Sequence, residues 1–174
     1  MRFMFSSLMG LPIGSIEDRA KVGVVGDIII NPDDGLLLGI IAKTGILNIQ
    51  PRFVSWADIR EVESGAVVIN SKDDLCEIDE VIRVKEVIDK NFSLTGLPVV
   101  TTDGNSLGDV YDYEIDVEKK TLFKIFCRAL LGQRHIISKS NIVRIELNKV
   151  VVRSAAVKSK ISMGTTAHAV KSPA

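Results

Sequence analysis

The chain has 174 residues, of which 46% are hydrophobic and 25% charged, an ordinary composition for a soluble globular protein. Its 22 basic and 22 acidic residues give a formal net charge of zero, which disfavours a general nucleic-acid binder because such proteins carry a basic excess. No apolar stretch approaches the roughly 20 residues of a membrane-spanning helix. Two scattered cysteines, Cys76 and Cys127, are typical of a reducing compartment, so we expect a cytoplasmic protein.

Residues 1–72 have the pattern of a small β domain. Their segments are short, rich in Val and Ile, and separated by turn residues such as those at positions 31–35, NPDDG. Gly, Asn and Asp favour turns because they tolerate positive φ or bond to nearby backbone. Short strands spaced in this way predict a small closed or half-open barrel, which leaves few sheet edges exposed.

An unusually apolar segment lies within this first domain. It contains Ile46, Leu47, Ile49, Phe53 and Trp56, the last being the single tryptophan of the chain. Core packing is one alternative for Trp56, whereas an exposed indole would mark a contact patch. We expect a partner interface at these five residues before anywhere else in the chain.

Residues 73–91 change the hydrophobic period and form a linker. Val81, Val84 and Ile88 recur at three- and four-residue spacing with charged residues between them, which predicts an amphipathic helix over about residues 79–90. Asp79 is the expected N-cap. Because the helix carries an apolar stripe, we expect it to pack on a neighbouring domain.

Residues 92–153 again have the pattern of short strands, and residues 122–127 form a nearly continuous apolar run. Beyond Arg153, small polar residues and lysines predict a flexible basic tail over residues 154–174. No Asp or Glu occurs after Glu146, whereas residues 58–90 carry ten acids against five bases. The predicted fold is therefore mainly β, with two tandem small β-barrels joined by a short amphipathic helix and followed by a flexible tail.

The two β-rich parts repeat one another. The segment SLMGLPI at 7–13 recurs as SLTGLPV at 93–99, and VVI at 67–69 recurs as VVV at 150–152. Between these landmarks, Gly26-Asp27 aligns with Gly108-Asp109. We expect the repeated carboxylate to hold a turn by accepting backbone N–H bonds. The repeats predict an internal duplication.

These landmarks resemble the PRC-barrel family, named for the cytoplasmic domain of the photosynthetic reaction-centre H subunit. The resemblance covers most of residues 5–153 as two copies, and Gly96, Gly104, Gly108 and the strand at 122–126 make the second copy the closer one. It implies two small barrels that act as assembly modules, like members that tune a membrane photosystem. Another member, the C-terminal domain of a ribosome maturation factor, assists small-subunit maturation. The family has no catalytic residues, so the resemblance implies none here.

No motif predicts catalysis, a cofactor or a metal site. Residues 23–27, GVVGD, lack the spacing and the lysine of a phosphate-binding loop, and we expect glycines at a strand bend. His135 and His168 have no cysteine or carboxylate at ligand spacing. We expect Cys127 to be buried and inert, and Cys76, beside acidic residues, to have a disfavoured thiolate.

The sequence therefore favours a non-catalytic protein-binding or assembly module over an enzyme. We expect protein partners, which include a second copy of the chain. The alternative is a ribosome- or RNA-associated maturation factor that uses the basic tail with Lys139, Arg144 and Lys149. Peripheral attachment of the tail to an anionic membrane is the weakest option, because each base contributes only about 1 kcal/mol.

Overall fold

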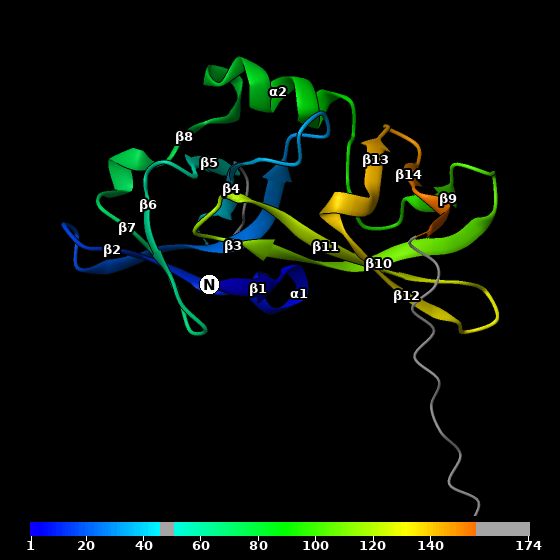
Figure 1. The fold of residues 1–174 in the computed structure, drawn as a ribbon. Helices are drawn as coiled ribbons and strands as arrows, with labels where there is room; N and C mark the ends of the chain where they lie inside the picture. The colour runs from blue at the N-terminus through cyan, green and yellow to red at the C-terminus, as the bar shows by residue number, and fades with distance from the viewer. Residues whose placement is uncertain (46–50, 156–174) are drawn as a thin grey trace, which may run out of the picture.

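The protein is described by a computed structural model that covers residues 1–45 and 51–155 (Figure 1). The first sheet has the strand order β6-β7-β2-β3-β4-β5-β8. Its strands are β2 (Pro12–Ser15), β3 (Ala20–Ile30), β4 (Leu37–Lys43), β5 (Arg52–Ser55), β6 (Ile59–Val62), β7 (Val67–Ile69) and β8 (Cys76–Glu77).

The second sheet has the order β12-β11-β10-β9-β14-β13, and the N-terminal strand β1 pairs with β10 outside this path. Its strands are β1 (Arg2–Met4), β9 (Pro98–Thr101), β10 (Ser106–Asp116), β11 (Thr121–Arg128), β12 (Arg134–Ser138), β13 (Ile142–Ile145) and β14 (Val150–Val152). The helical elements are α1 (Phe5–Leu8) and α2 (Ile82–Asp89), with 3-10 turns at Lys72–Asp74, Ile78–Glu80 and Lys139–Asn141. The prediction of a mainly β chain with two sheets and one short joining helix is confirmed.

The two sheets share their topology and their register. Strands β2 and β7 pair in parallel, as do β9 and β14, and the other pairings common to both sheets are antiparallel. In the long hairpins, Val25 pairs with Ala42 and Val110 with Cys127, and a bulge follows each of these pairs. Equivalent positions in the hairpins β3–β4 and β10–β11 therefore differ by a constant 85 residues (110 minus 25 and 127 minus 42).

This register corrects one part of the sequence alignment. Asp27 is equivalent to Asp112, and Gly108 is equivalent to Gly23. Each of these two aspartates accepts a hydrogen bond from the next backbone N–H, at 2.8 Å in both cases, so the expected structural role of a repeated carboxylate falls on Asp112 and not on Asp109. Gly108 is required for a different reason, because a Cβ there would collide with the carbonyl of Arg128.

The two halves meet in a locally two-fold arrangement at the ends of their long hairpins. The N–H of Leu37 donates to the carbonyl of Lys120 at 2.9 Å, and the N–H of Leu122 donates to the carbonyl of Gly35 at 2.8 Å. Adding 85 to the residue numbers of one donor and one acceptor gives those of the other bond, so the two bonds join equivalent positions. Leu36 and Thr121, which are also equivalent, form an isolated bridge between them. Each half therefore presents the same segment to the other.

The N-terminal residues cross from the first half to the second. Arg2–Met4 pair with residues 114–116 of β10, and Ser6 donates to the buried Asp112 from its N–H (3.2 Å) and its hydroxyl (2.5 Å). Conversely, β8 lies in the predicted linker but pairs with β5 of the first sheet. Backbone pairing therefore joins β1 to the second sheet, and joins β8, which lies within the predicted linker, to the first sheet.

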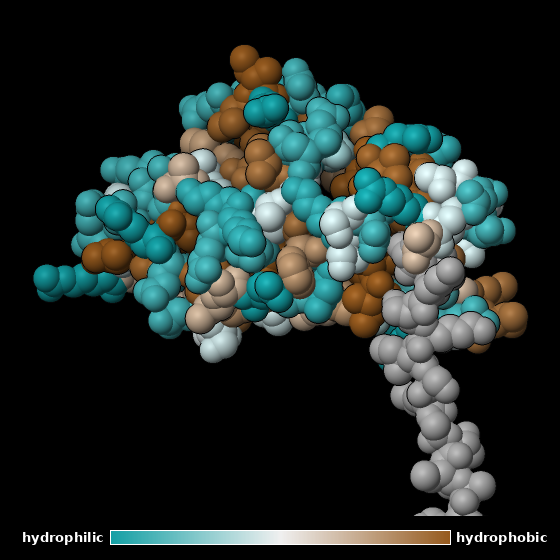
Figure 2. All heavy atoms as spheres, viewed as in Figure 1, coloured by the Kyte–Doolittle hydropathy of each residue, from teal (hydrophilic) through white to brown (hydrophobic). Residues whose placement is uncertain are grey.

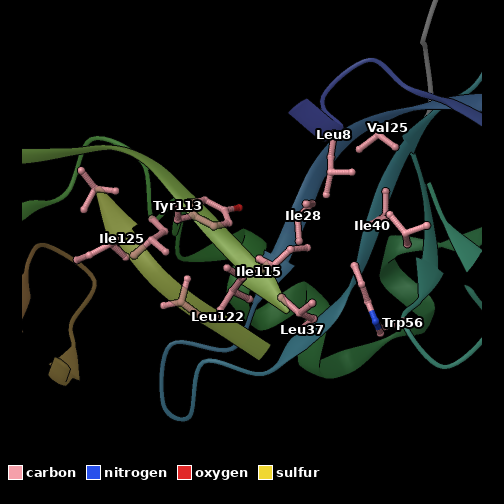
Figure 3. Close-up of a cluster of buried hydrophobic side chains, with 14 of the residues drawn as sticks. Leu8, Val25, Ile28, Leu37, Ile40, Trp56, Tyr113, Ile115, Leu122 and Ile125 are labelled. Atoms are coloured by element: carbon pink, nitrogen blue, oxygen red, sulfur yellow. The ribbon is translucent and has the colours of Figure 1, made fainter. Parts of the chain in front are cut away.

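A continuous hydrophobic core fills the space between the inner faces of the two sheets (Figure 3). The first half contributes residues such as Ile28, Ile40 and Trp56, and the second contributes residues such as Ile115 and Ile125. Because each part alone has a modest core, burying both inner faces against one another provides the apolar area that stabilises the pair.

Helix α2 lies over the outer face of the first sheet, as its apolar stripe predicts. Val84 and Val87 are buried against Ile29 and Phe53, forming a second, smaller cluster. The helix begins later than predicted: its N-cap is Val81, while Asp79 lies in the preceding 3-10 turn and pairs with Lys85 at 2.6 Å. The predicted tail, apart from residues 154 and 155, lies outside the described residues.

Candidate protein-interaction surface

The outer faces of the two sheets are built at equivalent positions but are covered differently. On the first face, Ile29, Leu38, Ile41 and Phe53 pack against α2. Their equivalents in the strand registers are Glu114, Phe123, Phe126 and Ile136. No described helix packs on these second-half positions, and Ile136 is 42% exposed whereas Phe53 is 2% exposed.

We define the second outer face by its apolar and cationic side chains. The apolar members form a row across strands β10, β11 and β12, with the rings of Tyr111 and Phe126 centred 6.2 Å apart. They are Tyr111, Phe123, Phe126 and Ile136, of which Tyr111 and Ile136 are exposed and the two phenylalanines half-buried. An aromatic row of this kind is typical of contact surfaces, because it offers large apolar area with few rotatable bonds.

Three cations lie on the aromatic rings of this face. The guanidinium of Arg2 lies 3.6 Å from the centroid of Phe123, and that of Arg128 lies 4.8 Å from the centroid of Tyr111. The ammonium of Lys124 lies between Phe123 and Phe126 and pairs with Glu114 at 2.6 Å. Cation–π contacts hold these charges over apolar surface. Arg2 also pairs with Asp116 at 3.7 Å, so the positive charge that is not compensated by an ion pair lies at Arg128 and the neighbouring Arg134.

A hairpin tip extends this face beyond Arg128 and Arg134. Leu130 and Leu131 are 102% and 90% exposed, and hydrophobic atoms are visible at this end of the molecule in Figure 2. Residues 119–145 contain seven Lys or Arg and no Asp or Glu. This asymmetry is visible in the sequence, and together with the two leucines it is the signal that could have identified the second half as the exposed contact region.

Five residues of the first half were predicted to form a partner interface, and the two that the structure describes, Phe53 and Trp56, are buried. Phe53 lies under α2, and Trp56 is 4% exposed within the main core, so neither offers a contact surface. For Trp56 the alternative of core packing holds. Ile46, Leu47 and Ile49 lie outside the described residues.

As the sequence predicts, neither cysteine has the lowered thiol pKa of a nucleophile. Burial raises the pKa of Cys127 to about 11, with a further contribution from Asp109. Burial also raises the pKa of the Cys76 thiol, and the charges of Glu80 and Asp58 add to this shift. Both thiols therefore remain protonated near neutral pH, and neither forms a disulfide.

Between the halves, the Tyr113 hydroxyl has its pKa raised well above its usual range by burial, with the charges of Asp27 and Asp112 adding to this shift. The same desolvation raises the pKa of Asp27. Tyr113 also stacks on Phe5, with ring centroids 4.6 Å apart, so its ring ties α1 to the second half. The hollow that Asp27 and Tyr113 line together holds only about 10 Å³, the volume of a single water site.

Within residues 1–45 and 51–155, no group of three His, Cys, Asp or Glu side chains is arranged to hold a metal ion. Among the helices of the same residues, none combines the length and the hydropathy needed to cross a bilayer. His135 lies on β12 beside Cys127, and His168 lies outside the described residues.

Comparison with protein families matches residues 2–75 to the PRC-barrel domain. A search of curated proteins found no significant match to the chain. The match falls on the first half, although the family landmarks in the sequence favour the second. The first half of this chain, over residues 2–75, is therefore a PRC-barrel domain.

Proposed function

We propose that the chain is a non-catalytic protein-binding or assembly module built from two PRC-barrel-like domains. The PRC-barrel domain at residues 2–75 supports this role, because such domains are seen in assembly and binding. The shared strand order and register support the proposal that residues 92–153 are a second copy. Fold alone does not establish function, so the proposal depends on a surface.

The observation that carries this proposal is the second outer face. Tyr111 and Ile136 are exposed beside two half-buried phenylalanines, and the neighbouring tip adds two leucines. Water-exposed apolar side chains grouped in this way mark protein contact sites, because burying them on a partner is favourable. We assign the partner contact to this face.

The test is affinity purification from the native cell with mass spectrometry, using Ile136→Asp and a matched control, Val143→Asp. Both residues are about equally exposed, at 42% and 45%, but Val143 lies on β13, away from the second outer face. We expect the partners of the unaltered chain to be lost with Ile136→Asp and retained with Val143→Asp. Identical sets of proteins for both variants, or no partner of the unaltered chain, would refute the proposal.

A ribosome- or RNA-associated role is the second candidate, favoured by the seven bases and no acids of residues 119–145. Two of these bases, Lys124 and Arg144, are each paired with a glutamate at 2.6 Å, so fewer charges remain for phosphate. This candidate predicts salt-sensitive binding to ribosomal particles that weakens when residues 154–174 are removed. Binding that is unchanged by salt and by this truncation would exclude it.

A further inference from the structure

We propose that the second outer face binds an amphipathic helix of a partner protein, with acidic residues beside its apolar stripe, seated as α2 is seated on the first sheet. This inference rests on the proposed binding function and specifies the partner's chemistry. It is carried by the equivalence of the two faces and by the charge of the uncovered one.

The first step is geometric. In the first half, α2 places Val84 and Val87 on Ile29 and Phe53, with Leu38 and Ile41 packed around them. The second half repeats three strands of this seat in the same register, as β10, β11 and β12, whereas β8, which pairs with β5, has no equivalent beside β12 among the described residues. A sheet surface that accepts one helix in the first half has an equivalent of the same strand geometry in the second.

The second step is the charge of the helix. Gly39 on the first face is replaced by Lys124 on the second, and Lys43 by Arg128. Arg2 from β1 and Arg134 on β12 lie at the margins. Lys124 is paired with Glu114 at 2.6 Å and Arg2 with Asp116 at 3.7 Å, so among the described residues Arg128 and Arg134 provide the cations of this face that have no ion pair. A helix that covered these cations with its own lysines would be repelled, whereas Glu or Asp beside its apolar stripe would pair with them.

The third step excludes two other occupants from this chain. Residues 156–174 carry Lys158, Lys160 and Lys171 and no acid, so their charge has the wrong sign for the face. The apolar stripe of α2 is buried in its own chain and is not free to cover a second copy. A helix from a different protein therefore fits the face best.

The experiment uses the full chain and three probes. The first is a peptide of residues 79–92, held helical by a side-chain staple, with Arg83→Glu, Lys85→Glu and Lys90→Glu. The second has the same apolar residues, with its acids replaced by lysine. The third is vesicles of equimolar phosphatidylcholine and phosphatidylglycerol, because the leucine tip with flanking arginines is also compatible with a lipid surface.

Amide shifts in NMR spectra report where each probe binds. We expect the acidic peptide to shift residues of β10, β11 and β12, and to bind at least about 10-fold more tightly than the basic peptide. Ile136→Asp should abolish this binding, while Val143→Asp should leave it unchanged. No saturable shift at any soluble peptide concentration, equal affinity for both peptides, or binding of the vesicles alone would overturn the inference.

The outcome is separable from that of the proposed function. If native partners still depend on Ile136 but the acidic peptide does not bind, the face contacts proteins and the helix inference is wrong. If partner capture does not depend on Ile136 and the peptide does not bind, both are wrong.

Discussion

The two halves of this protein have the same strand framework, but one outer face is covered by the chain itself and the other is not. In the first half, Phe53 is buried under α2, and its equivalent, Ile136, is exposed in the second. Both inner faces, by contrast, enter one common core. The difference shows that the same strand framework can bury its inner face in a common core while its outer face is covered in one half and exposed in the other.

The largest expected difference between the halves is at the equivalent positions 53 and 136. Phe53→Ala should lower the free energy of unfolding by about 4 kcal/mol, because it leaves a cavity under α2. Ile136→Ala should lower it by only about 1 kcal/mol, because that side chain is partly exposed. Chemical denaturation of both variants measures this difference, and equal losses would show that the second face is covered as well.

The next difference concerns the equivalent positions 39 and 124. A Cβ at Gly39 would collide with the carbonyl of Val54 and the ring of Phe53, so Gly39→Ala should cost about 3 kcal/mol of stability. Lys124→Ala removes two cation–π contacts and one partly exposed ion pair, and should cost about 1 kcal/mol. Thermal or denaturant unfolding distinguishes the two, and a stable Gly39→Ala variant would contradict the close approach of β4 and β5.

The framework of this comparison could be predicted from the sequence, because local patterns determine it. The alternating Val and Ile segments, the spacing of Val81, Val84 and Ile88, and the repeated SLxGLP segments predict two similar sheets and a packed helix. The buried, protonated state of Cys127 was likewise predictable from its place in an apolar strand.

The errors arise where backbone pairing and burial are not local. A bulge in β10 and the different loop lengths shift the alignment, so Asp109 was matched to Asp27 in place of Asp112. Phe53 and Trp56 have the composition of an interface, but only the fold shows that α2 and the main core bury them. The exposed face was missed because its residues lie on three strands that are brought together by pairing.

The smallest expected effect concerns pH and two aspartates of the first half. Burial raises the pKa of Asp27, so its ionisation opposes folding as pH rises through the raised pKa, above the usual 3.8. A hydrogen bond from the Ser15 hydroxyl, followed by the N–H of Lys72, lowers the pKa of Asp18. Its stabilising effect is present above about pH 3.8 and is lost as pH falls through the lowered pKa.

Denaturation of Asp27→Asn and Asp18→Asn between acidic and neutral pH checks these signs. Relative to the unaltered chain, Asp27→Asn should gain stability as pH rises, and Asp18→Asn should lose it. The same pH trend in both variants would contradict the assigned environments.

The most direct measurement of what covers the second outer face is photo-cross-linking in the native cell. A photoreactive amino acid is placed at position 136, with position 143 on β13 as the control, and the cross-linked peptides are identified by mass spectrometry. We predict that position 136, and not position 143, joins to a segment of another protein that has an apolar helical stripe and flanking acidic residues. Adducts to lipid or RNA, identical adducts at both positions, or none at position 136 would contradict the assignment of this face to a partner helix.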